Sequence, residues 1–177
     1  MENNLQLKKR QVKAILDTLK VSKKGGSGFG RRSLEQGIVQ DGILYFIGDG
    51  YFVLRYDLKD NSLNGIITFE ALEVWYKLST TRDLLTRDNI VSMITAVGSD
   101  DPLPPNNVEA FFNNEASAIE YITLNPKYFD IIARALDTEF IDIDFSGTMK
   151  PIIITSAEAK NITGLLLPAR DTRRRDL

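Results

Sequence analysis

Two spacings of apolar residues alternate along this chain and predict its elements. Around residues 8–21 and 125–136, apolar residues recur every three or four positions, which predicts helices that each bury one face. Short apolar runs at 3–7 and 121–124 predict one strand before each helix. After the helices, runs rich in apolar and β-branched residues predict strands at 34–40, 43–47, 51–58, 140–145, 151–155 and 164–167.

Capping and turn residues support this order. Asn125 and Pro126 stand where the second helix is expected to start, and these residue types favour the N-cap and the first helical position. The Asp41-Gly42 pair between two predicted strands is a hairpin signal. The sequence therefore predicts the order strand, helix, strand, strand, strand twice, over residues 3–58 and 121–170.

The middle segment, residues 59–120, follows a different pattern and is expected to be a helical and loop insertion. The predicted elements are a strand at 66–68, helices at 69–78 and 83–97, and a short strand at 108–112. Residues 98–107, GSDDPLPPNN, form the strongest break in the chain. At 177 residues, the chain fits one domain that contains both repeated units and the insertion.

Composition narrows the classes of function. The sequence is 43% apolar and 26% charged, as in globular proteins, and no apolar run reaches the length of a membrane span. It has no Cys and no His, which excludes disulfides, thiolate zinc sites and the serine triad. Without these metal-binding side chains, we expect no metal or cofactor. The start of the chain lacks a signal-peptide pattern, so we expect a cytoplasmic protein.

Charge is unevenly distributed along the chain. Residues 1–32 hold nine Lys/Arg against two acidic residues, a net charge of +7, and residues 170–177 add +2. The overall charge is −2, so the rest of the chain carries −11. A basic surface on an acidic body predicts a polyanionic partner that is bound on one face, whereas the alternative is that the basic ends are merely solvated.

Three local features resemble the end of the bacterial DNA polymerase III β subunit, the β sliding clamp. They are the strand-to-helix entry at Asn125, the segment 145–154 (FSGTMKPIII) and the ending 165–170 (LLLPAR). In that family, two β-α-β-β-β units make one domain with helices on one face of a curved antiparallel sheet. The resemblance implies an α+β DNA clamp fold, with residues 1–177 as a single clamp-like domain.

The resemblance also implies contact with double-stranded DNA. Clamp helices present cations to the phosphate backbone without reading bases, so binding is independent of sequence. The predicted helix 8–21 has basic residues opposite its apolar stripe, and a glycine-containing basic loop, residues 23–32, follows it. The candidate DNA-binding residues are Lys9, Arg10, Lys13, Lys20, Lys23, Lys24, Arg31 and Arg32.

A second implied site binds peptides of replication proteins. Clamps bind such peptides in an apolar pocket near the chain's end. The segment 48–54 resembles the Asp-Gly turn of that pocket, but Tyr51 and Phe52 replace the basic residues usual there. The candidate pocket residues are Gly50, Tyr51, Val53, Leu165, Leu167, Pro168, Ala169 and Arg170. The alternative is that residues 165–167 are only a core strand.

These features predict a non-enzymatic, sliding-clamp-like processivity or DNA-tethering protein. One domain cannot encircle DNA, so a ring would need several copies joined through edge strands. The first alternative is a clamp-like adaptor or inhibitor that binds replication proteins without encircling DNA. The second is a carboxylate-dependent enzyme, such as a nuclease, that uses Asp142 and Asp144.

Overall fold

The computed structural model describes residues 4–24, 35–48, 50–97, 108–112 and 122–169. In chain order, the elements are β1 (Gln6–Lys8), α1 (Lys9–Lys24), β2 (Gly37–Gln40), β3 (Ile43–Gly48), β4 (Phe52–Asp57), β5 (Gly65–Ile67), α2 (Phe69–Leu78), β6 (Leu84–Thr86), α3 (Arg87–Met93), the 3-10 helix η2 (Val108–Phe112), α4 (Pro126–Leu136), β7 (Asp142–Asp144), β8 (Ile152–Thr155) and β9 (Ile162–Leu166).

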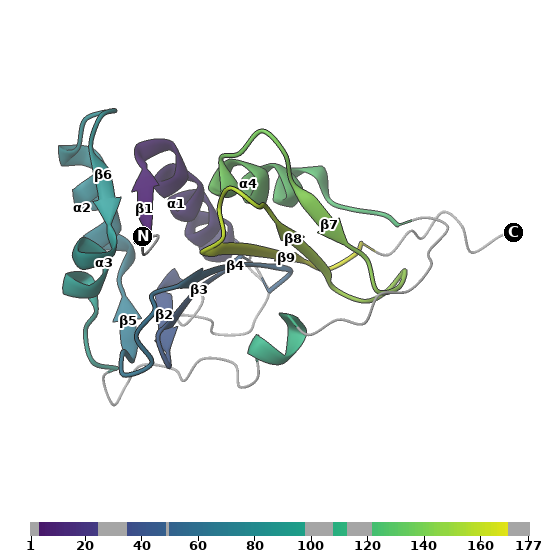
Figure 1. Cartoon of the computed structure of the whole chain (residues 1–177), viewed down its shortest axis with the longest axis horizontal. Helices are drawn as coiled ribbons and strands as arrows, with labels where there is room; N and C mark the ends of the chain where they lie inside the picture. The colour runs from purple at the N-terminus through teal and green to yellow at the C-terminus, as the bar shows by residue number, and fades with distance from the viewer. Residues whose placement is uncertain (1–3, 25–34, 49, 98–107, 113–121, 170–177) are drawn as a thin grey trace, which may run out of the picture.

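Seven strands form one antiparallel sheet in the order β5-β2-β3-β4-β9-β8-β7 (Figure 1). At its centre, β4 pairs with β9, so that Val53 faces Leu165 across the ladder. This pairing joins the strands that follow α1 to the strands that follow α4. The two halves of the chain therefore share one sheet.

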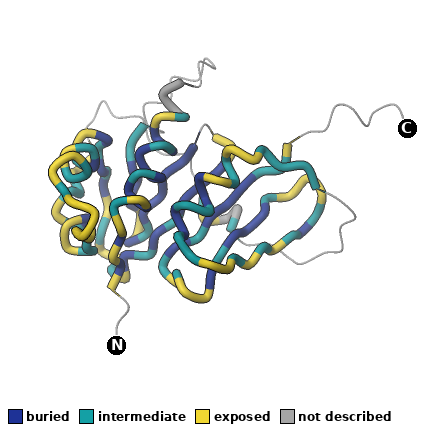
Figure 2. The backbone as a smooth tube through the Cα atoms, turned by 90° about the horizontal axis from the view of Figure 1, so that it is seen from above, coloured by how far each residue is buried: buried dark blue, intermediate teal, exposed yellow. Residues whose placement is uncertain are grey.

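The helices α1 and α4 lie side by side on one face of this sheet, and α2 lies beside α1 (Figure 1). Apolar side chains of the helices and of every second strand residue form the main core, with Leu19, Leu54 and Ile132 almost fully buried. Figure 2 shows the buried strands beneath the partly exposed helices. The predicted α+β class, with helices on one face of an antiparallel sheet, is confirmed. Among the helices that the structure describes, none combines the length and apolar character needed to cross a bilayer.

Local sequence explains where several elements turn or end. Asp41 and Gly42 have φ of 49° and 75°, the positive values that a tight β2–β3 hairpin requires. A Cβ on Gly42 would also lie 2.2 Å from the Asp60 carbonyl oxygen. The Asn125 side chain accepts a hydrogen bond from the Lys127 amide at the start of α4, as expected of an N-cap.

The prediction of one helix over 83–97 was wrong. Its first part is β6, which pairs with β1 in a separate two-stranded sheet and buries Leu85 completely. The Thr86 hydroxyl then accepts a bond from the Asn89 amide and starts the short helix α3. The residues just before Thr86 therefore form a strand, and the insertion contributes strands as well as helices.

Two predicted strands are absent from their expected places. Residues 108–112 form the 3-10 helix η2 instead of a strand. The described part of the predicted strand 121–124 joins no sheet, although the Thr123 carbonyl accepts a backbone bond from Ala169. In addition, the first unit has its predicted first strand, β1, but this strand pairs with β6 of the insertion and not with the seven-stranded sheet.

A buried glutamine connects the two central helices. The Gln11 amide of α1 donates to the Ala135 carbonyl of α4 at 2.9 Å, and its oxygen accepts from the Lys8 backbone amide. Ala135 lies in the last turn of α4, where backbone carbonyls lack partners within the helix. Gln11 therefore satisfies a helix end and holds α1 against α4.

We expect Gln11→Ala to lower the free energy of unfolding by about 1–3 kcal/mol, because a buried carbonyl loses its donor. Urea denaturation measures this change. The matched control is Gln40→Ala at the exposed end of β2, which should leave stability nearly unchanged. Equal effects of the two substitutions would contradict a structural role for Gln11.

Candidate DNA-binding and partner-binding surfaces

The predicted DNA-binding residues fall largely on one helix. Lys9, Arg10, Lys13 and Lys20 have described side chains on α1, and Lys23 and Lys24 form its last residues. Lys20 is exposed. The side chains of Lys23 and Lys24, and the whole of Arg31 and Arg32, lie outside the described residues.

Lys9 is engaged within the protein. Its ammonium donates to the Ser79 carbonyl at 2.6 Å and lies 4.7 Å from the centre of the Tyr76 ring. Ser79 is the C-cap of α2, so this contact joins α1 to the end of α2. Lys9 therefore has a structural role beside any role in DNA binding.

Arg10 and Lys13 form ion pairs at the surface. Arg10 Nε lies 2.6 Å from Asp137 Oδ1, and Lys13 Nζ lies 2.6 Å from Asp17 Oδ1. The Arg10 side chain is 68% exposed, so its guanidinium remains accessible to an anion. Exposed ion pairs contribute little free energy, so a phosphate can compete with these aspartates.

The helix α4 adds cations that the sequence patterns did not identify as site residues. Lys127 is exposed near its start, and Arg134 pairs with Asp17 of α1 at 3.1 Å and with Asp130 at 3.0 Å. Both are distant in sequence from the basic N-terminal segment. Arg134 lies near α1 only because the two helices pack together.

The predicted peptide pocket is brought together only in part. Val53 and Leu165 are paired across β4 and β9, and the Leu167 amide donates to the Tyr51 carbonyl. Val53, Leu165 and Leu167 belong to a second apolar cluster, on the sheet face away from the helices. The Tyr51 ring, in contrast, stacks on Tyr128 of α4, with 6.4 Å between ring centres.

The described remaining residues of the predicted pocket, Gly50, Pro168 and Ala169, flank the paired strands β4 and β9. Gly50 takes a φ of 75° in the turn before β4, which favours glycine there. Pro168 and Ala169 follow β9, and Arg170 lies outside the described residues. Among the described members, Val53 and Leu165 are buried and Tyr51 is exposed, so the peptide pocket stays a prediction.

Comparison with known proteins identifies one family. A stretch of 49 residues is 37% identical to the β sliding clamp of Staphylococcus epidermidis. In structure, 96% of the chain matches the DNA polymerase sliding clamp of Bacillus subtilis, with a TM-score of 0.59 and 13% sequence identity. The DNA polymerase III β subunit of Borrelia burgdorferi matches 96% with a TM-score of 0.60 and 10% identity. The predicted resemblance to the β sliding clamp family is confirmed.

The similarity covers only part of this chain's sequence and only part of each clamp chain. The sequence match spans 28% of this chain and 13% of the curated clamp, and no protein-family model matches the chain. The structural matches cover 64% and 63% of the two clamp chains, so the clamp-like domain spans less than two thirds of their length. At 10–13% identity, the structural likeness shows the shared fold alone.

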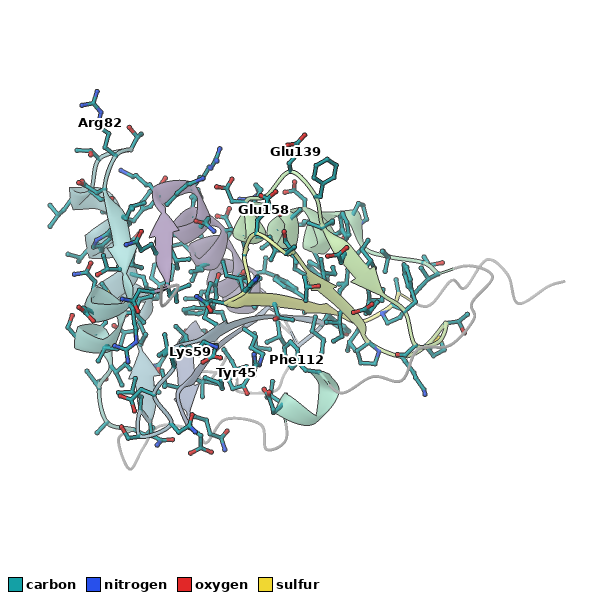
Figure 3. All side chains as sticks on the ribbon, in the orientation of Figure 1. Tyr45, Lys59, Arg82, Phe112, Glu139 and Glu158 are labelled. Atoms are coloured by element: carbon teal, nitrogen blue, oxygen red, sulfur yellow. The ribbon has the colours of Figure 1, made fainter. Side chains whose placement is uncertain are left out.

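On the outer face of the clamp-like domain, an acidic residue of η2 is held by the sheet. Arg55 of β4 donates to both carboxylate oxygens of Glu109, at 2.7 and 3.0 Å, and the Tyr45 hydroxyl of β3 also donates to Glu109. Phe112 lies beside Tyr45 (Figure 3), and the Arg55 guanidinium lies over the Phe112 ring. We call these four residues the outer clasp. No sequence pattern predicted this cluster, because Glu109 and Phe112 are far from Tyr45 and Arg55 in the chain.

The clasp shifts the pKa values of three of its members, Tyr45, Arg55 and Glu109. Hydrogen bonding by Arg55 holds the pKa of the Glu109 carboxyl below its usual value. Burial, and then the hydrogen bond to Glu109, raise the pKa of Tyr45. Glu109 therefore stays ionised and Tyr45 stays a hydrogen-bond donor near neutral pH.

The carboxylates considered for catalysis lie apart from these surfaces. Asp142 and Asp144 are exposed on the short edge strand β7. Within the part of the chain that the structure describes, no three His, Cys, Asp or Glu residues cluster so as to hold a metal ion.

We expect Glu109→Gln to lower the free energy of unfolding at pH 7 by about 0.2–1 kcal/mol, which is the usual contribution of an ion pair at the surface. A lowered folded-state pKa stabilises the protein above the unfolded pKa of about 4.3 and loses this effect as pH falls through the folded value. The difference between parent and variant should therefore shrink toward zero below about pH 4. Urea denaturation at a series of pH values tests this, and a difference that persists at low pH would contradict it.

Proposed function

We propose that this clamp-like domain is a non-enzymatic DNA-tethering protein of DNA replication or a related DNA process. It holds the phosphate backbone of double-stranded DNA through the helix layer. It binds partner proteins where β4 begins and β9 ends, near Tyr51 and Leu167. The observation that carries the proposal is the pair α1 and α4, side by side on one face of a clamp-fold sheet, with exposed cations on α1.

The chemistry of tethering is electrostatic. Lys and Arg side chains that replace counterions on DNA bind any sequence equally, and added salt weakens this binding steeply. On α1, the cations Arg10, Lys13 and Lys20 are available at the surface. Lys127 and Arg134 of α4 extend the same surface. The aspartates between them keep affinity moderate, which suits a protein that moves along DNA.

One observation favours a second candidate, an adaptor or inhibitor that binds replication proteins without encircling DNA. A head-to-tail ring built by strand pairing needs both sheet edges. At the β5 edge, Ile66 already exchanges two backbone bonds with Thr95, each 2.9 Å long. At the other edge, β7 carries two exposed aspartates. Light scattering at several concentrations, with and without DNA, separates a closed oligomer from a monomer.

We expect Lys9→Glu, Arg10→Glu and Lys13→Glu together to weaken DNA binding equally for unrelated duplexes. Loss of three phosphate contacts should reduce the slope of log affinity against log salt by about 2–3. The matched control reverses the charges of Lys59, Arg82 and Lys150, which are exposed outside the helices. Circular dichroism checks folding, because Lys9 also contacts Ser79. Unchanged affinity of a folded triple variant would show that the basic helix face is only solvated.

We expect a peptide that carries a clamp-binding motif to bind the full chain, and Leu167→Asp to abolish binding. A carboxylate at position 167 would place a charge against the apolar cluster on the sheet face away from the helices, which Leu167 contacts. We call this cluster, which includes Val53, Leu165 and Ile153, the outer apolar cluster. A chain that ends at Arg170 tests whether residues 171–177 hinder or help the peptide. Fluorescence anisotropy measures all three proteins. If none binds while all are folded, partner binding cannot be assigned to this surface.

A further inference from the structure

The outer face of the sheet carries a row of buried apolar side chains. Strand register places Ile47, Val53, Leu165 and Ile153 opposite one another across β3, β4, β9 and β8. Each of these residues is at most 8% exposed. Since the helices cover the other face, something else must cover this row.

The described cover is η2. Val108 and Phe112 of this helix pack against the outer apolar cluster, below the sheet in Figure 1. The Phe112 ring centre lies 6.4 Å from that of Tyr45 and 5.7 Å from the Arg55 guanidinium carbon. A short helical turn of the chain itself therefore occupies the face that also bears Val53, Leu165 and Leu167.

The sheet offers this turn a specific set of partners. Arg55 is only 21% exposed and uses two nitrogens to hold the Glu109 carboxylate, while Tyr45 adds a third donor. A partly buried guanidinium is more favourable with an anion beside it, so an occupant that supplies a carboxylate suits this face. Phe112, three positions after Glu109, supplies the ring that lies against Tyr45 and Arg55.

We propose that the outer sheet face is a docking surface for a partner segment that carries an acidic residue followed three positions later by an aromatic residue. In this chain η2 is the resident occupant, and a partner segment of the same chemistry displaces it. The inference rests on the peptide-binding part of the proposed function, since the surface includes three of the predicted pocket residues, and it is independent of DNA binding.

The contacts of η2 suit a displaceable occupant. A 3-10 helix of five residues has little stability of its own and depends on its side-chain contacts. The Glu109 side chain is 51% exposed, so its ion pair competes with water. A tethered occupant reduces the apparent affinity of a partner in proportion to the fraction of open protein.

The experiment uses the full chain and a released variant, Glu109→Ala with Phe112→Ala. The probe is a fluorescent peptide with the sequence of residues 106–114, NNVEAFFNN. We expect the released variant to bind the probe about tenfold or more tightly than the unmodified chain, because its own occupant no longer competes. Adding Arg55→Ala to the released variant should remove this gain, and so should alanine at both key positions of the probe.

A matched control shows that the gain comes from this face. Glu73→Ala with Leu78→Ala removes an ion-paired carboxylate and an exposed apolar side chain from α2. This variant should bind the probe no better than the unmodified chain. A folded released variant that binds the probe no better than this control would overturn the proposal.

Two further measurements cover other outcomes. If the released variant does not fold, hydrogen exchange on the unmodified chain tests whether η2 opens. The amides of 108–112 should exchange faster than those of β4, and equal protection would overturn displacement.

The clamp-motif peptide is titrated in parallel. If it binds and the η2 probe does not, this docking proposal fails while the partner-binding function stands; if neither binds, both fail.

Discussion

The antiparallel pairing of β4 with β9 is the contact on which the rest of this structure depends. It joins residues 52–56 to residues 162–166, more than a hundred positions later in the chain. Closing so long a loop costs entropy, which the buried apolar residues on both faces of the ladder offset. Because of this one ladder, α1 and α4 become neighbours, and Tyr51 and Leu167 meet at one end of the sheet.

The same ladder gives the domain two chemically different faces. Leu54 and Leu166 point into the core beneath the helices, whereas Val53 and Leu165 point to the opposite side. The helix side ends in an outer layer of charged residues, and the opposite side ends in an apolar row beneath η2. A period of two along each strand thus places a charged helix layer and an apolar row on opposite sides of one sheet.

Ion pairs in the helix layer engage several of the cations that we propose to contact DNA. Asp17 contacts both Lys13 and Arg134, and Asp137 contacts both Lys8 and Arg10. Two of these pairs, Arg134–Asp17 and Arg10–Asp137, link α1 to α4 and its C-cap, and they leave cations within reach of solvent. The buried Gln11 bond is unaffected by salt to a first approximation, so the layer can exchange its ionic contacts without losing its packing.

From the sequence alone, most helices and strands could be predicted, because periodicity, the Asp41-Gly42 turn and the Asn125-Pro126 cap act over a few residues. The clamp fold was implied by the resemblance of segments 145–154 and 165–170 to that family, and the basic residues of α1 were expected on a common helix. The pairing of residues 84–86 with β1 and the helical turn at 108–112 depend on the tertiary structure, since long-range partners outweighed weak local preference. The outer clasp was likewise beyond the sequence: Tyr45, Arg55 and Glu109 become one cluster only after the sheet has formed and η2 has packed against it.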